Sequence, residues 1–246
     1  MKHSSNNENG AFKQWMNQLL SFGLKREQIA GGRQQDLSNQ AWLRAVMKEN
    51  AKKNKEKTTM LNKLPVIVLD TETTGFRPEL GDEIISVCAV RLTGIKEEDR
   101  LSTHVKLDRA LSEDIKKLTG ITEEMLAEAP ALEKIMPQLL SLLESNLIVG
   151  YHISHDIAFI NHYLWKTIRR RLTNPALDMK LILERLYSGR KFNEFDDALK
   201  YFSIKINNRH TAEGDTEGAI CLWKHILDEC EKRSVRTLND FHRLLV

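Results

Sequence analysis

The pattern of apolar and polar residues predicts that a long folded region begins at Pro65. Residues 66–69 form an uninterrupted apolar run, which is typical of a strand buried on both faces of a sheet. Residues 147–150 form a second run of this kind. Two further strands are predicted, one at 83–92, rich in Ile and Val, and one with alternating polarity at 101–107.

Apolar residues at helical spacing predict a series of helices around these strands. The helix that starts near Asp156 shows the spacing well, because Ile157, Ile160 and Leu164 share one face. The predicted helical ranges are 112–118, 122–128, 131–143, 156–170, 178–187, 195–202, 213–231 and 235–245. This order of elements predicts an α/β fold, a mixed sheet flanked by helices.

The first 63 residues differ from the rest of the chain in pattern and in charge. Apolar residues at helical spacing predict one short helix around Trp15 and another around Trp42, followed by a lysine-rich stretch that ends near Lys63. Residues 1–63 carry 12 Lys and Arg against 5 Asp and Glu, whereas residues 64–246 carry 25 against 29. We therefore predict a basic helical N-terminal extension and linker, followed by one folded domain.

This charge distribution leaves two interpretations of the extension open. A basic arm on a slightly acidic domain is suited to an anionic partner, and its two helices can dock on another protein. Alternatively, the arm is a solvated, disordered leader, or its two helices pack on the domain.

Composition narrows the class of protein further. A 246-residue chain with 41% hydrophobic residues can bury one sizeable core. Its cysteines, Cys88, Cys221 and Cys230, lack the CxxC spacing of a zinc site or a disulfide framework, which fits a reducing cytosol. No apolar run is long enough to span a bilayer. We expect a soluble cytoplasmic protein with no membrane partner.

Two carboxylates directly follow the first buried strand. Asp70 and Glu72 are two residues apart, so both point to the same side if the strand continues through Thr71. Ligands commonly bind at this end of the strands in α/β sheets. Alone, the pair can equally be a solvated strand end. Residues 70–75 also resemble the nucleophile loop of haloacid-dehalogenase-type phosphatases, although Glu72 stands where that loop needs a second Asp.

Three more residues complete the candidate chemistry. Asp156 follows a buried strand and starts a helix, where it can be an N-cap or face a metal shared with Asp70. His210 and Asp215 lie at the entry to the predicted helix 213–231 and can face one cavity. Histidine is suited to proton transfer, because its ordinary pKa of about 6.5 lies near neutral pH.

Together these segments resemble the three motifs of the DEDDh family of 3′-to-5′ exonucleases. Residues 70–75 resemble the first motif, Asp156 with His152 upstream resembles the second, and residues 210–215, with the spacing His-x4-Asp, resemble the third. The resemblance covers about residues 64–231. It implies a ribonuclease-H-like fold. The family includes the proofreading subunit of bacterial DNA polymerase III.

Two residues depart from the second motif of this family. The motif usually reads His-Asn-x-x-Phe-Asp, and here Ile153 replaces the Asn and His155 replaces the Phe. In the family that Asn helps to contact the substrate strand, so the departure concerns substrate affinity or choice. The carboxylates and His210 match the family pattern.

The resemblance implies hydrolysis of phosphodiester bonds with two Mg²⁺ or Mn²⁺ ions. It assigns metal binding to Asp70, Glu72, Asp156 and Asp215, with Asp70 bridging the two ions, and it makes His210 the general base. Oxygen ligands suit these hard cations.

The implied substrate is a single-stranded or frayed DNA 3′ end, and the implied product is a nucleoside 5′-monophosphate. Thr73, Thr74, Phe76 and His152 are implied to hold the terminal nucleotide. Such an enzyme serves DNA replication proofreading or repair. RNA-trimming enzymes of the family share the same residues, so RNA stays an alternative. Another alternative is a nucleic-acid-binding or polymerase-binding module that uses residues 1–63 and in which catalysis is secondary.

Overall fold

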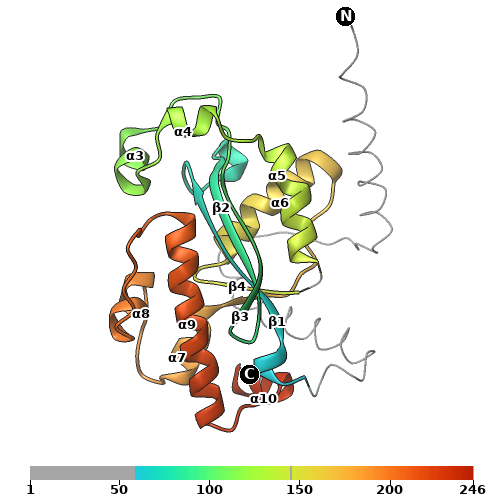
Figure 1. Cartoon of the computed structure of the whole chain (residues 1–246), viewed down its shortest axis with the longest axis vertical. Coiled ribbons are helices and arrows are strands. Elements are labelled where there is room, and N and C mark those ends of the chain that lie inside the picture. The colour runs from blue at the N-terminus through green and yellow to red at the C-terminus, as the bar shows by residue number, and fades with distance from the viewer. Residues whose placement is uncertain (1–58, 145, 246) are drawn as a thin grey trace, which may run out of the picture.

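The centre of the molecule is a five-stranded mixed sheet (Figure 1). The structure is a computed structural model and describes residues 59–144 and 146–245. The strands are β1 (Pro65–Thr73), β2 (Ile84–Thr93), β3 (Lys96–His104), β4 (Leu147–Gly150) and β5 (Ala176–Asp178). Their order in the sheet is β3-β2-β1-β4-β5, in which β1 is antiparallel to β2 and parallel to β4. The predicted α/β class with a mixed sheet is confirmed.

Helices cover both faces of this sheet (Figure 1). They are α3 (Glu113–Thr119), α4 (Glu123–Ala127), α5 (Leu132–Leu143), α6 (Ser154–Ile168), α7 (Met179–Leu186), α8 (Phe195–Tyr201), α9 (Ala212–Lys232) and α10 (Leu238–Leu245). Two short 3₁₀ helices, η1 (Leu61–Lys63) and η2 (Pro78–Leu80), flank β1 in the sequence.

The alternating side chains of β1 separate two cores. Val66 and Val68 pack with residues of α7, α8, α9 and α10, whereas Ile67 and Leu69 pack with residues of α5 and α6. Successive side chains of a strand point to opposite faces. Even-numbered residues of β1 therefore face the layer of α9, and odd-numbered residues face the layer of α6.

Most predicted elements are confirmed to within three residues, but two strands differ. The strand predicted at 101–107 is wrong in its bounds, because β3 runs from Lys96 to His104. Its first half is charged and exposed, as is common in an edge strand, and so lacks the apolar alternation that the prediction relied on. The short strand β5 was not predicted, and among its three residues only Leu177 is buried.

The predicted helices around Trp15 and Trp42 lie outside the described residues. Near the predicted linker end, Leu61 is buried and its N–H donates to the carbonyl of Arg236 at 2.8 Å. The division of the chain at residue 64 stays a prediction. Within residues 59–144 and 146–245, no helix combines the length and the apolar character needed to cross a bilayer.

Candidate active site

Three carboxylates meet at the carboxyl end of β1. Asp70 and Glu72 are even-numbered and so face α9, where Asp215 lies in the first turn. One carboxylate oxygen of each residue lies within 4.8 Å of the others. A donor set made only of oxygen atoms is the one that Mg²⁺ and Mn²⁺ prefer. These residues therefore fit a divalent cation.

Asp156 approaches this cluster from the opposite helical layer. It lies in the first turn of α6, and the N-cap of that helix is Ile153, so the N-cap interpretation of Asp156 is wrong. The buried carboxylate of Asp156 accepts a hydrogen bond from the Thr71 hydroxyl at 2.6 Å. Its charge also raises the pKa of Asp70. The structure thus brings all four predicted carboxylates to one end of β1.

Burial makes these carboxylates hard to ionise in the absence of a cation. It raises the pKa of Asp70 well above the ordinary range, and the charges of Asp156, Asp215 and Glu72 raise it further. Burial also raises the pKa of Glu72 and of Asp156, each to about 7. The pKa of Asp215 is raised by burial against the opposing charge of Arg209. Perturbed carboxylates that cluster in this way are typical of functional sites.

Close backbone packing fixes the start of α9. The hydroxyl of Thr211 accepts the N–H of Gly214 at 3.0 Å, and the N–H of His210 donates to Asp215 at 3.3 Å. A Cβ atom at Gly214 would lie 1.8 Å from the carbonyl oxygen of Asn208. The glycine of the third motif is therefore required by this contact between the loop and the helix.

We expect the substitution Gly214→Ala to lower both the stability and the activity of the protein. The added methyl group must displace the loop at Asn208, and overpacking of this kind costs about 1–3 kcal/mol. Thermal unfolding measures the loss, with Asp228→Ala, an exposed position on α9, as the matched control. A melting temperature equal to that of the control would contradict the proposed contact.

Arg209 is the cation beside the carboxylates. Its guanidinium pairs with Asp215 and with Asp196, the latter at 2.6 Å, and lies over the ring of Phe195 at 5.0 Å. One of its nitrogens lies 3.5 Å from Nδ1 of His210, which is partly buried at the edge of the cluster. Arg209 was not among the predicted site residues, although its position directly before the third motif was a signal.

Two of the four predicted nucleotide-binding residues lie together beside the carboxylates. The hydroxyl of Thr73 donates to the carbonyl of Gly75 at 2.6 Å and lies 3.2 Å from Nε2 of His155. The side chain of Phe76 is 86% exposed, and its ring meets the ring of His155 at a centroid distance of 5.6 Å. An exposed aromatic ring next to a carboxylate cluster is available for stacking with a base.

The other two predicted nucleotide-binding residues are engaged within the protein. The hydroxyl of Thr74 accepts hydrogen bonds from Arg109 at 2.9 Å and from the N–H of Glu83 at 3.0 Å. His152 is exposed, and its N–H donates to Asp178 at 3.2 Å. Nucleotide binding by all four residues stays a prediction.

The two departures from the second motif have different structural consequences. Ile153 is 3% exposed and belongs to the core between the sheet and α6. The prediction that Ile153 replaces the Asn is wrong, because the six-residue motif counted back from Asp156 places its Asn at His152 and a variable position at Ile153. His155 is partly buried and contacts Thr73, Phe76 and Phe159, so it lies beside the predicted nucleotide contacts.

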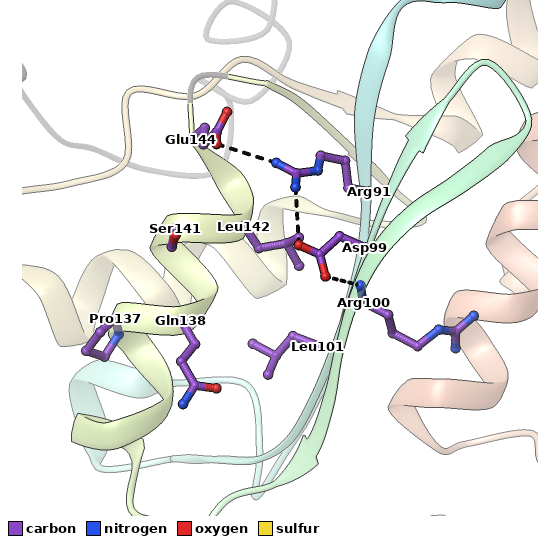
Figure 2. A pocket seen from close by; sticks show the side chains of 9 residues that line it. All are labelled: Arg91, Asp99, Arg100, Leu101, Pro137, Gln138, Ser141, Leu142 and Glu144. Carbon is purple, nitrogen blue, oxygen red and sulfur yellow. Dashed lines mark hydrogen bonds and ion pairs between the residues drawn. The ribbon is translucent and has the colours of Figure 1, made fainter.

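A groove of about 480 Å³ lies away from this cluster, between α5 and β3 (Figure 2). Arg91 in its wall pairs with Asp99 at 3.2 Å and with Glu144 at 3.5 Å. The guanidinium of Arg100 points to the other side of β3, toward α9, where it pairs with Glu217 at 2.5 Å (Figure 2). The charges of these two arginines are therefore met within the protein, and the predicted site residues do not line the groove.

Comparison with known protein families identifies the family of this chain. The family described as Exonuclease (RNase_T) matches residues 67–222, more than half of the sequence. The chain belongs to this exonuclease family. DNA polymerase III subunit epsilon of Aquifex aeolicus is 32% identical over 183 residues, which cover 74% of this chain and 90% of that protein. The predicted exonuclease class is confirmed. Residues 70–75 therefore no longer support the phosphatase alternative.

Longer relatives match over a small part of their length. The 3'-5' exonuclease DinG of Bacillus subtilis is 26% identical over 187 residues, which cover 75% of this chain and 20% of that protein. DNA polymerase III PolC-type of Caldanaerobacter subterraneus is 27% identical over 180 residues, 73% of this chain and 13% of that protein. Exonuclease regions similar to this chain thus occur within larger proteins.

Solved structures confirm the predicted ribonuclease-H-like fold. Exonuclease X in complex with 5' overhanging duplex DNA has a TM-score of 0.51 at 18% identity, covering 74% of this chain and 99% of that chain. The nuclease domain of 3'hExo, a DEDDh family member bound to rAMP, has a TM-score of 0.56 at 18% identity, covering 67% of this chain and 92% of that chain. At this identity the likeness concerns the fold.

Proposed function

We propose that this chain is a metal-dependent 3′-to-5′ exonuclease that releases nucleoside 5′-monophosphates from single-stranded or frayed DNA 3′ ends. The main observation in support is that carboxylate oxygens of Asp70, Glu72 and Asp215 lie within 4.8 Å of one another. Asp156 lies at the same end of β1, and His210 lies at the edge of the cluster. The epsilon relative supports DNA as the substrate and a role in replication proofreading or repair.

The carboxylates would hold two Mg²⁺ or Mn²⁺ ions. Asp70, Glu72 and Asp215 would hold one ion, and Asp70 and Asp156 would hold the second. When bound, such ions activate the attacking water and neutralise the charge on the scissile phosphate. The hydrogen bond from Thr71 fixes the orientation of the Asp156 carboxylate.

His210 is proposed to accept the proton of the attacking water at a ring nitrogen. Its backbone is left-handed, with φ of 63°, and its N–H donates to Asp215. This bond ties the position of the imidazole to that of a metal ligand. General-base catalysis by a histidine placed in this way contributes about 10²- to 10⁴-fold to the rate.

The proposal also concerns the partner of residues 1–63 and the choice between DNA and RNA as substrate. Residues 1–63 are proposed to bind a DNA polymerase or another protein in the cytoplasm. RNA is the alternative substrate, because one protein of similar structure is a 3'-exonuclease with 3'-end specific recognition of histone mRNA stem-loop.

One experiment tests the proposed function. A 5′-labelled single-stranded DNA oligonucleotide and its RNA counterpart are incubated with Mg²⁺ or Mn²⁺. We expect a ladder that shortens from the 3′ end with the wild type and with Asp228→Ala, and no shortening with Asp215→Ala or in EDTA. The oligonucleotide that is shortened faster shows whether the enzyme prefers DNA or RNA. Oligonucleotides that stay intact with both metals would contradict the proposal.

A further inference from the structure

His155, which departs from the family motif, contacts a residue of β1. Nε2 of His155 lies 3.2 Å from the hydroxyl oxygen of Thr73. That hydroxyl has one hydrogen, which it donates to the carbonyl of Gly75 at 2.6 Å. The hydrogen between Thr73 and the ring must therefore come from Nε2 of His155. A phenylalanine at position 155 has no such donor.

His155 also connects an exposed ring to a buried one. Its ring centroid lies 5.6 Å from that of Phe76, which is 86% exposed, and 4.9 Å from that of Phe159, which is 3% exposed. The contact with Phe76 is edge-to-face and that with Phe159 is tilted, and ring contacts at such distances are favourable. Phe76 is thereby supported on the core from one edge while most of its surface faces solvent.

The backbone at this point departs from regular pairing. Glu72 pairs with Ser86 of β2, whereas the next residue, Thr73, pairs with Ile84. Such irregularities redirect side chains and are frequent next to active sites. The hydrogen bond from His155 therefore fixes Thr73 where the sheet alone leaves it less constrained.

From these contacts we infer that His155 is a positioning residue for the terminal nucleotide, acting through Thr73 and Phe76. This inference rests on the proposed function, since it concerns nucleotide binding at that site. Fixing the two side chains in advance lowers the entropy that is lost on binding. The effect is on affinity for the nucleotide, because the hydrogen bond of His155 goes to Thr73 and not to a carboxylate of the cluster.

Two substitutions separate the two contacts of His155. His155→Phe restores the residue of the family motif, keeps an aromatic ring against Phe76 and Phe159, and removes the donor to Thr73. His155→Gln keeps a donor of similar reach and removes the ring. We expect His155→Phe to raise KM for the DNA oligonucleotide about three- to tenfold, the effect of one hydrogen bond, with kcat within twofold.

Binding of thymidine 5′-monophosphate in the presence of Mn²⁺ tests the inference independently of hydrolysis. We expect Kd to rise three- to tenfold in His155→Phe and less in His155→Gln, and no further in Thr73→Val/His155→Phe than in Thr73→Val. Wild type that binds the nucleotide without shortening DNA would contradict the proposed function alone. A Kd that is unchanged in His155→Phe, or wild type that does not bind the nucleotide, would overturn the inference.

Discussion

Asp70→Asn is expected to abolish the shortening of DNA 3′ ends while making the metal-free protein more stable. Asp70 lies at the centre of the carboxylates, because Asp156, Asp215 and Glu72 all act on its pKa. If Asp70 holds the proposed metal ions, an amide cannot replace its anionic carboxylate. Metal ions supply several kcal/mol of transition-state stabilisation. At about 1.4 kcal/mol for each factor of ten, the rate should fall about 10³-fold or more.

The gain in stability follows from the raised pKa values. The pKa of Glu72 is about 7 in the fold against a reference value of 4.5, so the folded protein binds this proton more tightly than the unfolded chain. The free energy of unfolding of the metal-free protein therefore decreases as the pH rises from about 4.5 to 7. Burial and the charges of Asp156, Asp215 and Glu72 raise the pKa of Asp70 in the same direction, so an uncharged amide at this position removes its share of the destabilisation.

Thermal unfolding in EDTA measures this second effect. At pH 8 we expect Asp70→Asn to raise the melting temperature by roughly 2–4 °C, the shift that about 1 kcal/mol produces in a domain of this size. The difference should shrink at pH 5, where Glu72 and Asp156, each with a pKa of about 7, are largely protonated. Asp228→Asn, at the exposed face of α9, is the matched control. A melting temperature that does not change at either pH would contradict the electrostatic account.

The carboxylates of β1 were predictable because they depend on a local regularity. A strand has a period of two, so Asp70 and Glu72 share a face wherever the strand extends through Thr71. The strand does extend to Thr73. The buried strands at the centre of the sheet were also predictable from local sequence, because strands buried on both faces form uninterrupted apolar runs.

Contacts between distant elements were not predictable in this way. The sequence left Asp156 as an N-cap or a metal ligand. The first interpretation is wrong because α6 begins at Ser154 with Ile153 as its N-cap, and the bond from Thr71, 85 positions away, could not be predicted from the local pattern. Likewise, Arg209 and Asp196 come from different segments, and no local periodicity connects them. The position of His155 against Thr73 is a third case, in which the motif marked the residue as unusual without indicating its partner.

His210→Asn is expected to lower kcat about 10²- to 10⁴-fold, the usual contribution of a general base. Asparagine is the suitable replacement because the backbone at His210 has φ of 63°, a conformation that asparagine adopts more readily than most residues. It also keeps the backbone N–H that donates to Asp215. The substitution therefore removes the imidazole and leaves the support of the metal ligand in place.

The affinity for Mn²⁺ distinguishes this loss from that of Asp70→Asn. Calorimetric titration should give a Kd for Mn²⁺ within twofold of wild type in His210→Asn and a much weaker one in Asp70→Asn. Ser203→Asn, at another left-handed residue with φ of 55°, controls for the backbone conformation.

A rate of His210→Asn within tenfold of wild type would show that another group accepts the proton. Loss of Mn²⁺ affinity together with the rate would assign His210 to the support of Asp215. A slow enzyme that still binds its metal is the result that separates proton transfer from metal binding in this site, since the two proposed functions belong to different side chains, those of His210 and Asp215.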